Sequence, residues 1–176
     1  KNLIEMDKYI RYIRLAMTLT DNEQPPALED FMSNDSLKKS YELSADAESF
    51  TNIPNIVPVS KGWVSKEFSE KEQHYGLDYA AAEGSIVRAT ARGLVTNVSV
   101  DEYLGNVVTI DHGNGFISRF AHCKEIISHK GATVERGETV ATVGSSGKSS
   151  SGPHLHYELT KQGKPVDPQL FIVKGL

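Results

Sequence analysis

Residues 106–122 read NVVTIDHGNGFISRFAH, and this stretch indicates the fold class. Two runs rich in Val, Ile, Thr and Phe flank a short segment, 111–115, that contains Gly113, Asn114 and Gly115. β-branched and aromatic residues favour strands, and Gly and Asn between two such runs favour a tight turn. The stretch therefore predicts an antiparallel β-hairpin.

The same pattern of short apolar alternation broken by glycine recurs on both sides of this hairpin. It is found in SIVRATARGLVTNVSV (85–100), TVERGETVATVGSSG (133–147) and HLHYELTKQGKPVDP (154–168). Repeated runs of this kind predict several antiparallel strands. We therefore expect a mainly β domain over residues 51–176, built as a small antiparallel β-sheet or a β-sandwich-like fold.

A helical segment is predicted at the N-terminus, over residues 1–50. Apolar residues recur there at steps of three and four, which predicts a helix over about residues 2–19: Leu3, Met6, Ile10, Ile13 and Met17. Paired prolines at 25 and 26 end it, and a second, shorter helix is expected over residues 28–43. The first helix either packs on its own domain or is the end of a longer coiled coil, through which chains would oligomerise. The proline-containing stretch 52–60 places the domain boundary near residue 50.

The composition is that of an ordinary globular protein, with 39% hydrophobic residues, 24% charged residues and a net charge of −4. Its Lys and Arg residues are scattered among acids, which excludes a phosphate-tracking, nucleic-acid-binding surface. No apolar run reaches the roughly 18 residues that would cross a bilayer. Because the chain begins at Lys1, we expect it to be a processed piece of a longer protein, with any membrane anchor or export signal outside these residues.

A histidine and an aspartate stand close together in QHYGLDYAA, residues 73–81. His74 and Asp78 would share a face if the segment were helical, but Gly76 and the surrounding β pattern favour an extended chain. In a strand, residues 74, 76 and 78 project to one side. Gly76 would then leave open space between an imidazole and a carboxylate.

A second histidine pair lies in GPHLHYEL, residues 152–159. His154 and His156 would point to the same face of a strand, roughly 6.5–7 Å apart at the backbone. A metal bound by His156 would leave His154 unligated but close to a bound water. Two imidazole nitrogens and one carboxylate oxygen make a three-ligand set with an open position, which is typical of catalytic zinc. A single cysteine, Cys123, excludes a thiol-rich structural site.

Other candidate residues have simpler interpretations. His112 is interpreted as a hairpin residue and His129 as a solvated loop residue. Cys123 is interpreted as a small buried filler, with a redox role left open. The loop GSSGKSSSG, residues 144–152, is flexible in composition and is expected to form one wall of a groove beside the second histidine pair.

Four segments together resemble the lysostaphin/LytM-type metalloendopeptidases in motif, order and spacing. These are HYGLD (74–78), AAAEGSIVRATARGLV (80–95), GNVVTIDHGNGFISRFAH (105–122) and GSSGKSSSGPHLHYEL (144–159). The resemblance extends over about residues 57–171. It departs from the family at FSEK (68–71), where relatives carry Phe-Gly-x-Arg, and at FAHC (120–123), where many carry Tyr-Ala-His-Leu. The first departure alters a loop and puts substrate preference in doubt, and neither removes a metal ligand.

The resemblance implies a role for each of five residues. His74, Asp78 and His156 would bind zinc. His154 and His122 would act as the general base and the stabiliser of the transition state, and the sequence leaves open which does which. The family fold is a small antiparallel β domain with a groove, and its substrates are peptide bonds in peptidoglycan.

We therefore expect a zinc-dependent endopeptidase of the bacterial cell envelope, periplasmic or extracellular, that hydrolyses peptide cross-links of peptidoglycan. The alternative is a peptidoglycan-binding protein, non-catalytic or autoinhibited by its N-terminal region, that activates another cell-wall hydrolase. A third interpretation comes from residues 130–144, which resemble the hairpin of lipoyl and biotinyl carriers. That hairpin has no lysine at a tight turn, and zinc ligands have no role in swinging-arm chemistry.

Overall fold

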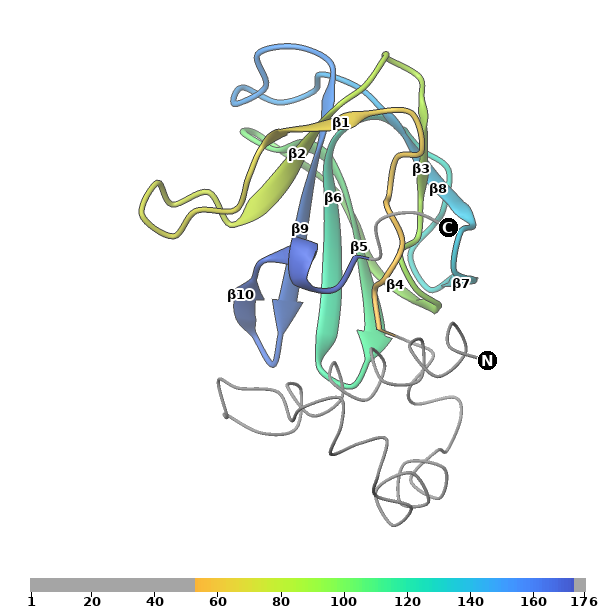
Figure 1. The fold of residues 1–176 in the computed structure, drawn as a ribbon. Helices are drawn as coiled ribbons and strands as arrows, with labels where there is room; N and C mark the ends of the chain where they lie inside the picture. The colour runs from red at the N-terminus through yellow and green to blue at the C-terminus, as the bar shows by residue number, and fades with distance from the viewer. Residues whose placement is uncertain (1–52, 173–176) are drawn as a thin grey trace, which may run out of the picture. The chain divides into compact units, whose positions relative to one another are not determined.

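The computed structural model describes residues 53–172, which form an antiparallel β domain (Figure 1). Its elements are β1 (Trp63–Lys66), β2 (Gly76–Ala80), β3 (Ile86–Arg88), β4 (Gly93–Asp101), β5 (Gly105–Gly113), β6 (Phe116–Ile126), β7 (Thr133–Val134), β8 (Thr139–Val143), β9 (His154–Lys161), β10 (Lys164–Val166) and the 3-10 helix η1 (Pro168–Leu170). The described residues contain no α-helix. The prediction of a mainly β, antiparallel domain is confirmed.

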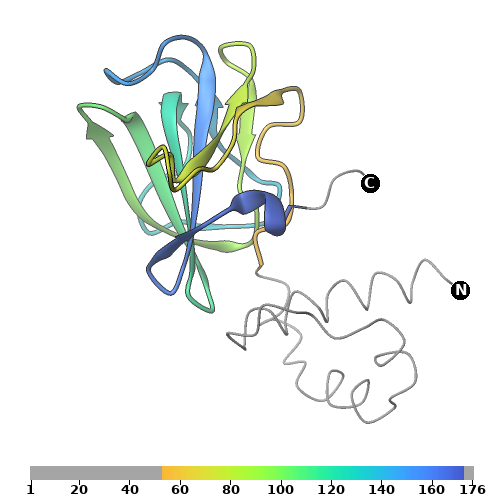
Figure 2. The same ribbon diagram turned by 60° about the vertical axis from the view of Figure 1, so that its left-hand side comes forward.

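All ten strands belong to one hydrogen-bonded sheet. Its main order is β1-β2-β9-β6-β5-β4-β7, while β10 pairs with β9, and β8 pairs with both β6 and β3. The sheet is strongly twisted, as the two views in Figures 1 and 2 show. The sequence left open a single antiparallel sheet or a sandwich-like fold. The strand pairing shows a single branched sheet.

The hairpin predicted from residues 106–122 is formed by β5 and β6. Gly113 pairs with Phe116, which leaves Asn114 and Gly115 as a two-residue turn. Both turn residues have positive φ, of 52° and 77°. This is the backbone that a type I′ turn requires, and Asn and Gly adopt it at the lowest steric cost.

Strand β9 separates the hydrophobic core from a polar face. Leu155, Tyr157 and Leu159 are fully buried. Successive side chains of a strand point to opposite faces, so His154, His156 and Glu158 project to the other side. The residues that pack the core thereby fix the orientation of the residues that form the polar face.

Strand β6 changes its partner at His122. Residues 116–121 pair with β9, and residues 123–126 pair with β8. At the same place β6 has one residue more than β5, a β-bulge, and His122 has a positive φ of 59°. A bulge bends its strand and re-aims a side chain. It places His122 at the fork between two diverging strands.

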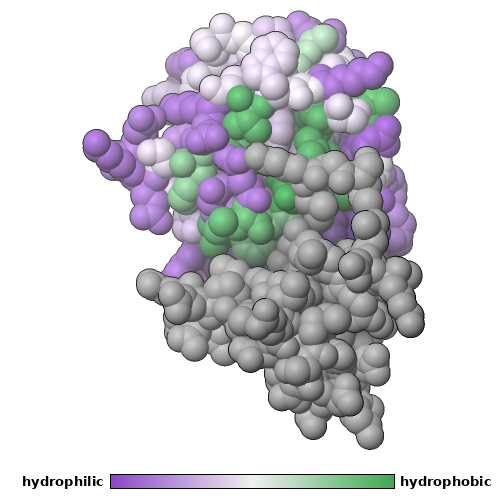
Figure 3. All heavy atoms as spheres, viewed as in Figure 1, coloured by the Kyte–Doolittle hydropathy of each residue, from purple (hydrophilic) through white to green (hydrophobic). Residues whose placement is uncertain are grey.

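The predicted helices over residues 2–19 and 28–43 lie outside the described residues, and the domain boundary near residue 50 stays a prediction. Within residues 53–172 no helix is long and apolar enough to cross a membrane. The face of the described domain seen in Figure 3 is of mixed polarity, with hydrophilic residues around a central group of hydrophobic ones.

His112, interpreted from the sequence as a hairpin residue, is a buried side chain at the end of β5. Its Nδ1–H donates to the carbonyl oxygen of Arg92 at 2.9 Å, and its Nε2 accepts from the Ser118 hydroxyl at 2.7 Å. Only 1% of the residue is exposed. Burial lowers its pKa from the ordinary value of 6.5, although the Arg92 carbonyl opposes the shift.

We expect His112 to make the fold sensitive to acid. In the unfolded chain His112 binds a proton below about pH 6.5, whereas in the folded protein it binds one only at lower pH. The contribution of His112 to the free energy of unfolding is therefore full above about pH 6.5 and decreases below it. One such group changes the free energy of unfolding by at most about 1.4 kcal/mol per pH unit. Urea unfolding near pH 7 and near pH 5.5 measures this, and His112→Gln should show a smaller loss on acidification. An equal pH dependence in both proteins would contradict this role.

Candidate metal centre

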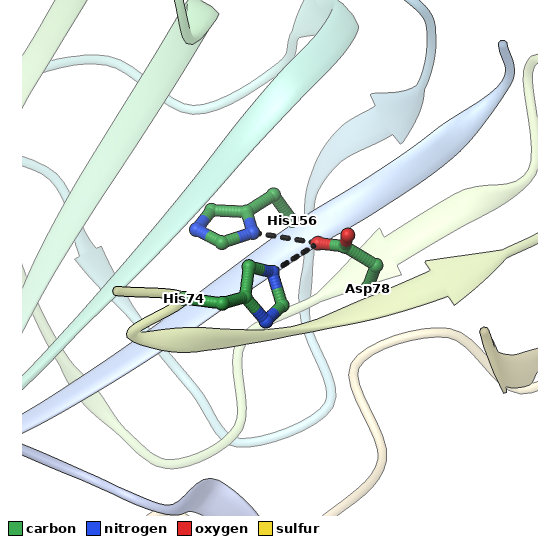
Figure 4. A group of neighbouring side chains, drawn as sticks. All are labelled: His74, Asp78 and His156. Carbon is green, nitrogen blue, oxygen red and sulfur yellow. Dashed lines mark hydrogen bonds and ion pairs between the residues drawn. The ribbon is translucent and has the colours of Figure 1, made fainter. Parts of the chain in front are cut away.

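His74, Asp78 and His156 meet at one point of the polar face, as Figure 4 shows. One ligand atom from each lies within 4.8 Å of the others. Asp78 Oδ1 is 2.6 Å from His156 Nδ1 and 3.1 Å from His74 Nε2. Atoms bound to one tetrahedral zinc ion lie roughly 3.3 Å apart, given zinc–ligand bonds of about 2.0–2.1 Å. The two separations from Asp78 are shorter than this, so the three groups converge closely enough to bind one ion after a small outward shift.

Two features of the backbone bring these residues together. Strands β2 and β9 pair with Asp78 directly opposite His156. His74 precedes β2 and is fixed by a β-bridge to Ser69, with both N–H···O=C bonds at 2.9 Å. The segment is thus extended rather than helical, as predicted from the sequence.

Gly76 has a more specific role than leaving open space. A Cβ built at this position would lie 2.8 Å from Cε1 of His156 and 2.7 Å from the carbonyl oxygen of Tyr157. Real Cβ atoms do not approach this closely. The imidazole of His156 fills the room above Gly76, so a residue without a side chain is required there.

The hydrogen bonds around the site leave electron pairs facing each other. His74 Nδ1 lies 2.7 Å from the carbonyl oxygen of Glu67, which can only accept, so this nitrogen carries the hydrogen. The lone pair of the neutral ring, on Nε2, then faces the Asp78 carboxylate at 3.1 Å. Two acceptors at this distance repel each other unless a proton or a metal ion lies between them. The donor set of two imidazoles and one carboxylate suits a zinc ion.

The charges of the site favour a cation as well. Burial would raise the pKa of Asp78, but hydrogen bonds from His156 and His74 lower it to about 2. Burial would lower the pKa of His156, but the carboxylates of Asp78 and Glu158 raise it to about 9. Burial would raise the pKa of Glu158, but His156 and Arg119 lower it. Both carboxylates therefore stay ionised at neutral pH and favour positive charge between them, on a protonated His156 or on a metal ion.

His154 and His122 lie beside this group. Nε2 of His154 is 4.0 Å from Asp78 Oδ1, and the rings of His154 and His122 are 4.7 Å apart between centroids. Each Nδ1–H donates to a backbone carbonyl, that of Gly152 at 2.8 Å and that of Ser146 at 2.7 Å. The structure thus brings together all five residues selected from the sequence, while their individual roles stay predictions.

The loop of residues 144–152 is held more firmly than its composition suggested. The amides of Lys148 and Ser149 donate to the carbonyl oxygens of Glu102 and Tyr103, in the turn between β4 and β5. A Cβ built on Gly147 would lie 2.2 Å from the Tyr103 oxygen. The glycine permits this close approach of two backbones. The groove wall expected here stays a prediction.

Sequence reasoning missed Glu158. Its Oε1 lies 3.2 Å from His156 Nε2, and its Oε2 accepts from Arg119 Nη1 at 3.0 Å. Residues 154, 156 and 158 alternate along one strand, so the spacing His-x-His-x-Glu was the available signal.

Two residues outside the cluster fit their simpler interpretations. Cys123 is fully buried, and burial raises the pKa of its thiol to about 12, as expected for an inert core residue. His129 is exposed in a loop.

Comparisons with known proteins agree with this geometry. The sequence model of the family described as Peptidase family M23 matches residues 72–168. The chain is 44% identical over 95 residues to the DD-carboxypeptidase/endopeptidase Mpg of Neisseria meningitidis, and 35% identical over 120 residues to the peptidoglycan DD-endopeptidase ShyA of Vibrio cholerae. A crystal structure of a zinc-containing peptidase from Vibrio cholerae superposes with a TM-score of 0.55 at 31% identity, covering 64% of this chain and 38% of that one.

These matches cover only part of each relative. The aligned residues make up 54% of this chain and 22% of Mpg, and 62% of this chain and 28% of ShyA. The chain thus spans less than a third of the length of either curated relative.

Proposed function

Because the chain belongs to peptidase family M23, we propose that it is a zinc-dependent endopeptidase of the cell envelope that hydrolyses peptide cross-links of peptidoglycan. The names of two relatives, a DD-endopeptidase and a DD-carboxypeptidase/endopeptidase, support cleavage between two D-amino acids. The observation that carries the proposal is the meeting of His74, Asp78 and His156 around a point that two further imidazoles flank.

The metal ligands would be His74 Nε2, the Asp78 carboxylate and His156 Nδ1, the three groups that face one another. A zinc ion held there would supply a bound water with a pKa near 7 and would polarise the scissile carbonyl. Three protein ligands would leave the ion accessible to substrate or solvent, as in catalytic rather than structural zinc sites.

We propose His154 as the general base. Its Nδ1–H is held by the Gly152 carbonyl, so the lone pair of the neutral ring is on Nε2, the atom 4.0 Å from Asp78. It can accept a proton from the attacking water, and the nearby carboxylate stabilises the imidazolium that forms.

We propose that His122 transfers the proton after the attack. Burial lowers its pKa, so it is neutral before the reaction, and its Nδ1–H is held by the Ser146 carbonyl. Its Nε2 can therefore accept a proton that comes from the attacking water through the neighbouring His154. Once protonated, it can donate to the oxyanion or to the leaving amine.

We expect digestion of purified peptidoglycan to depend on the metal. The full chain is incubated with sacculi, and the released fragments are identified by mass spectrometry. With zinc, cross-linked dimers should decrease and monomers should appear, each hydrolysed bond adding one water. A chelator should reduce release to the level without protein, and added zinc should restore it.

The same experiment separates the alternatives. Protein that sediments with sacculi but releases no fragments would indicate a binding protein that activates another hydrolase. Loss of one terminal residue from uncross-linked stem peptides would indicate carboxypeptidase activity instead. Unchanged release in the presence of chelator would contradict a metal-dependent mechanism.

A further inference from the structure

One of the four clustered histidines is oriented differently from the others. His74, His122 and His154 each donate Nδ1–H to a backbone carbonyl oxygen. His156 has no such backbone bond, and its outer nitrogen, Nε2, contacts a side chain, the carboxylate of Glu158, at 3.2 Å. A side-chain substitution can therefore remove the outer partner of His156 alone.

Glu158 is itself held in place by the sheet. It lies directly opposite Arg119 in the β6–β9 pairing, and Oε2 accepts from Arg119 Nη1 at 3.0 Å while Oε1 faces His156. The Glu158 side chain is 19% exposed and that of Arg119 is 47% exposed. Each carboxylate oxygen thus has one partner, and the half-exposed arginine closes the outer side.

The neighbouring strand on the other side, β2, holds His156 by one side chain only, that of Asp78 in the metal centre. There Gly76 lies opposite Glu158 in the β2–β9 pairing and leaves room for the imidazole without a side chain to hold it. The polar contacts that orient the ring are those of its two nitrogens. One of them faces Asp78 in the metal centre, so Glu158 is the group left to fix the other.

We propose that Glu158, held by Arg119, is the positioning residue of the metal centre: it accepts the Nε2 hydrogen of His156 and so directs the Nδ1 lone pair to the zinc. The inference rests on the proposed function, because it needs zinc at this site. A carboxylate behind a ligating imidazole fixes the ring and its tautomer and makes the ligand more basic, and losing it costs roughly 10–100-fold in metal affinity.

The zinc affinity of the purified full chain tests the proposal, measured by competition with a chromophoric chelator. Glu158→Ala should bind zinc roughly 10–100-fold more weakly than the unsubstituted protein. Glu158→Gln should lose less, because its amide oxygen can still accept the Nε2 hydrogen. The matched control is Glu135→Ala, which removes a carboxylate from an exposed ion pair with Arg92 and should leave the zinc affinity unchanged.

Thermal unfolding of the metal-free proteins separates positioning from general stability. The proposal predicts that zinc affinity decreases from the unsubstituted protein to Glu158→Gln and then to Glu158→Ala. The melting temperatures of the metal-free proteins should not follow this order. Unchanged affinity in Glu158→Ala, or a loss equal to that of Glu135→Ala, would overturn it. If the alanine variant does not fold, Glu158→Gln decides: a several-fold loss supports the proposal and unchanged affinity refutes it. Absence of zinc binding by the unsubstituted protein would instead refute the proposed function itself.

Discussion

Replacing His156 by alanine is expected to abolish both zinc binding and hydrolysis. The substitution removes the ligand nitrogen that lies 2.6 Å from the Asp78 carboxylate and leaves only His74 and Asp78. Loss of a residue behind a ligand already weakens metal binding roughly 10–100-fold, so loss of the ligand itself should exceed that range. Peptidoglycan cleavage should fall to the level of the chelator-treated protein.

Zinc content after dialysis and fragment release from sacculi measure this effect together. His129→Ala is the control, because that histidine is exposed and lies outside the cluster. The control should keep full zinc content and full activity. Full zinc content in His156→Ala would refute the assignment of this residue as a ligand.

His154→Ala should separate catalysis from metal binding. His154 lies beside the ligands, 4.0 Å from Asp78, and its other nitrogen is bound to a backbone carbonyl. The variant should therefore keep zinc at full stoichiometry. Losing a general base should lower kcat by roughly 10²–10⁴-fold, with a much smaller change in KM.

Steady-state kinetics on a soluble cross-linked peptide, with zinc content measured on the same samples, would test this. A zinc-free His154→Ala protein would make His154 a ligand rather than a base. A variant with zinc and unaltered kcat would transfer the general base to another group, with His122 as the nearest imidazole.

Local pattern was sufficient to predict several parts of this structure. Alternating apolar residues around an Asn-Gly turn predicted the β5–β6 hairpin, because both strand and turn preferences are short-range. The period of two along a strand predicted that His154 and His156 share a face, and Gly76 correctly favoured an extended chain at His74, which forms a β-bridge with Ser69. The roles assigned to the clustered residues came from the family resemblance instead.

Other parts depend on contacts between distant segments. Asp78 and His156 are 78 positions apart, and only the pairing of β2 with β9 makes them neighbours. The partnership of Glu158 with Arg119 likewise needs the β6–β9 register. Local periodicity carries no information about which strand lies beside which.

The bulge at His122 had no visible sequence signal. The surrounding residues, FAHC (120–123), contain neither glycine nor asparagine, the residues that usually mark a positive φ. Its conformation is fixed by tertiary contacts, with the amide bound to the Leu104 carbonyl at 2.8 Å and the ring to that of Ser146 at 2.7 Å. A strained residue at a functional site is a common exception to local prediction.

Anomalous X-ray scattering at the zinc absorption edge, from crystals of the zinc-loaded protein, tests the central claim most directly. We expect one peak within bonding distance of His74 Nε2, Asp78 Oδ1 and His156 Nδ1, with neither His154 nor His122 bound to it. A peak at other residues, or zinc-loaded crystals without a peak at this point, would contradict the account.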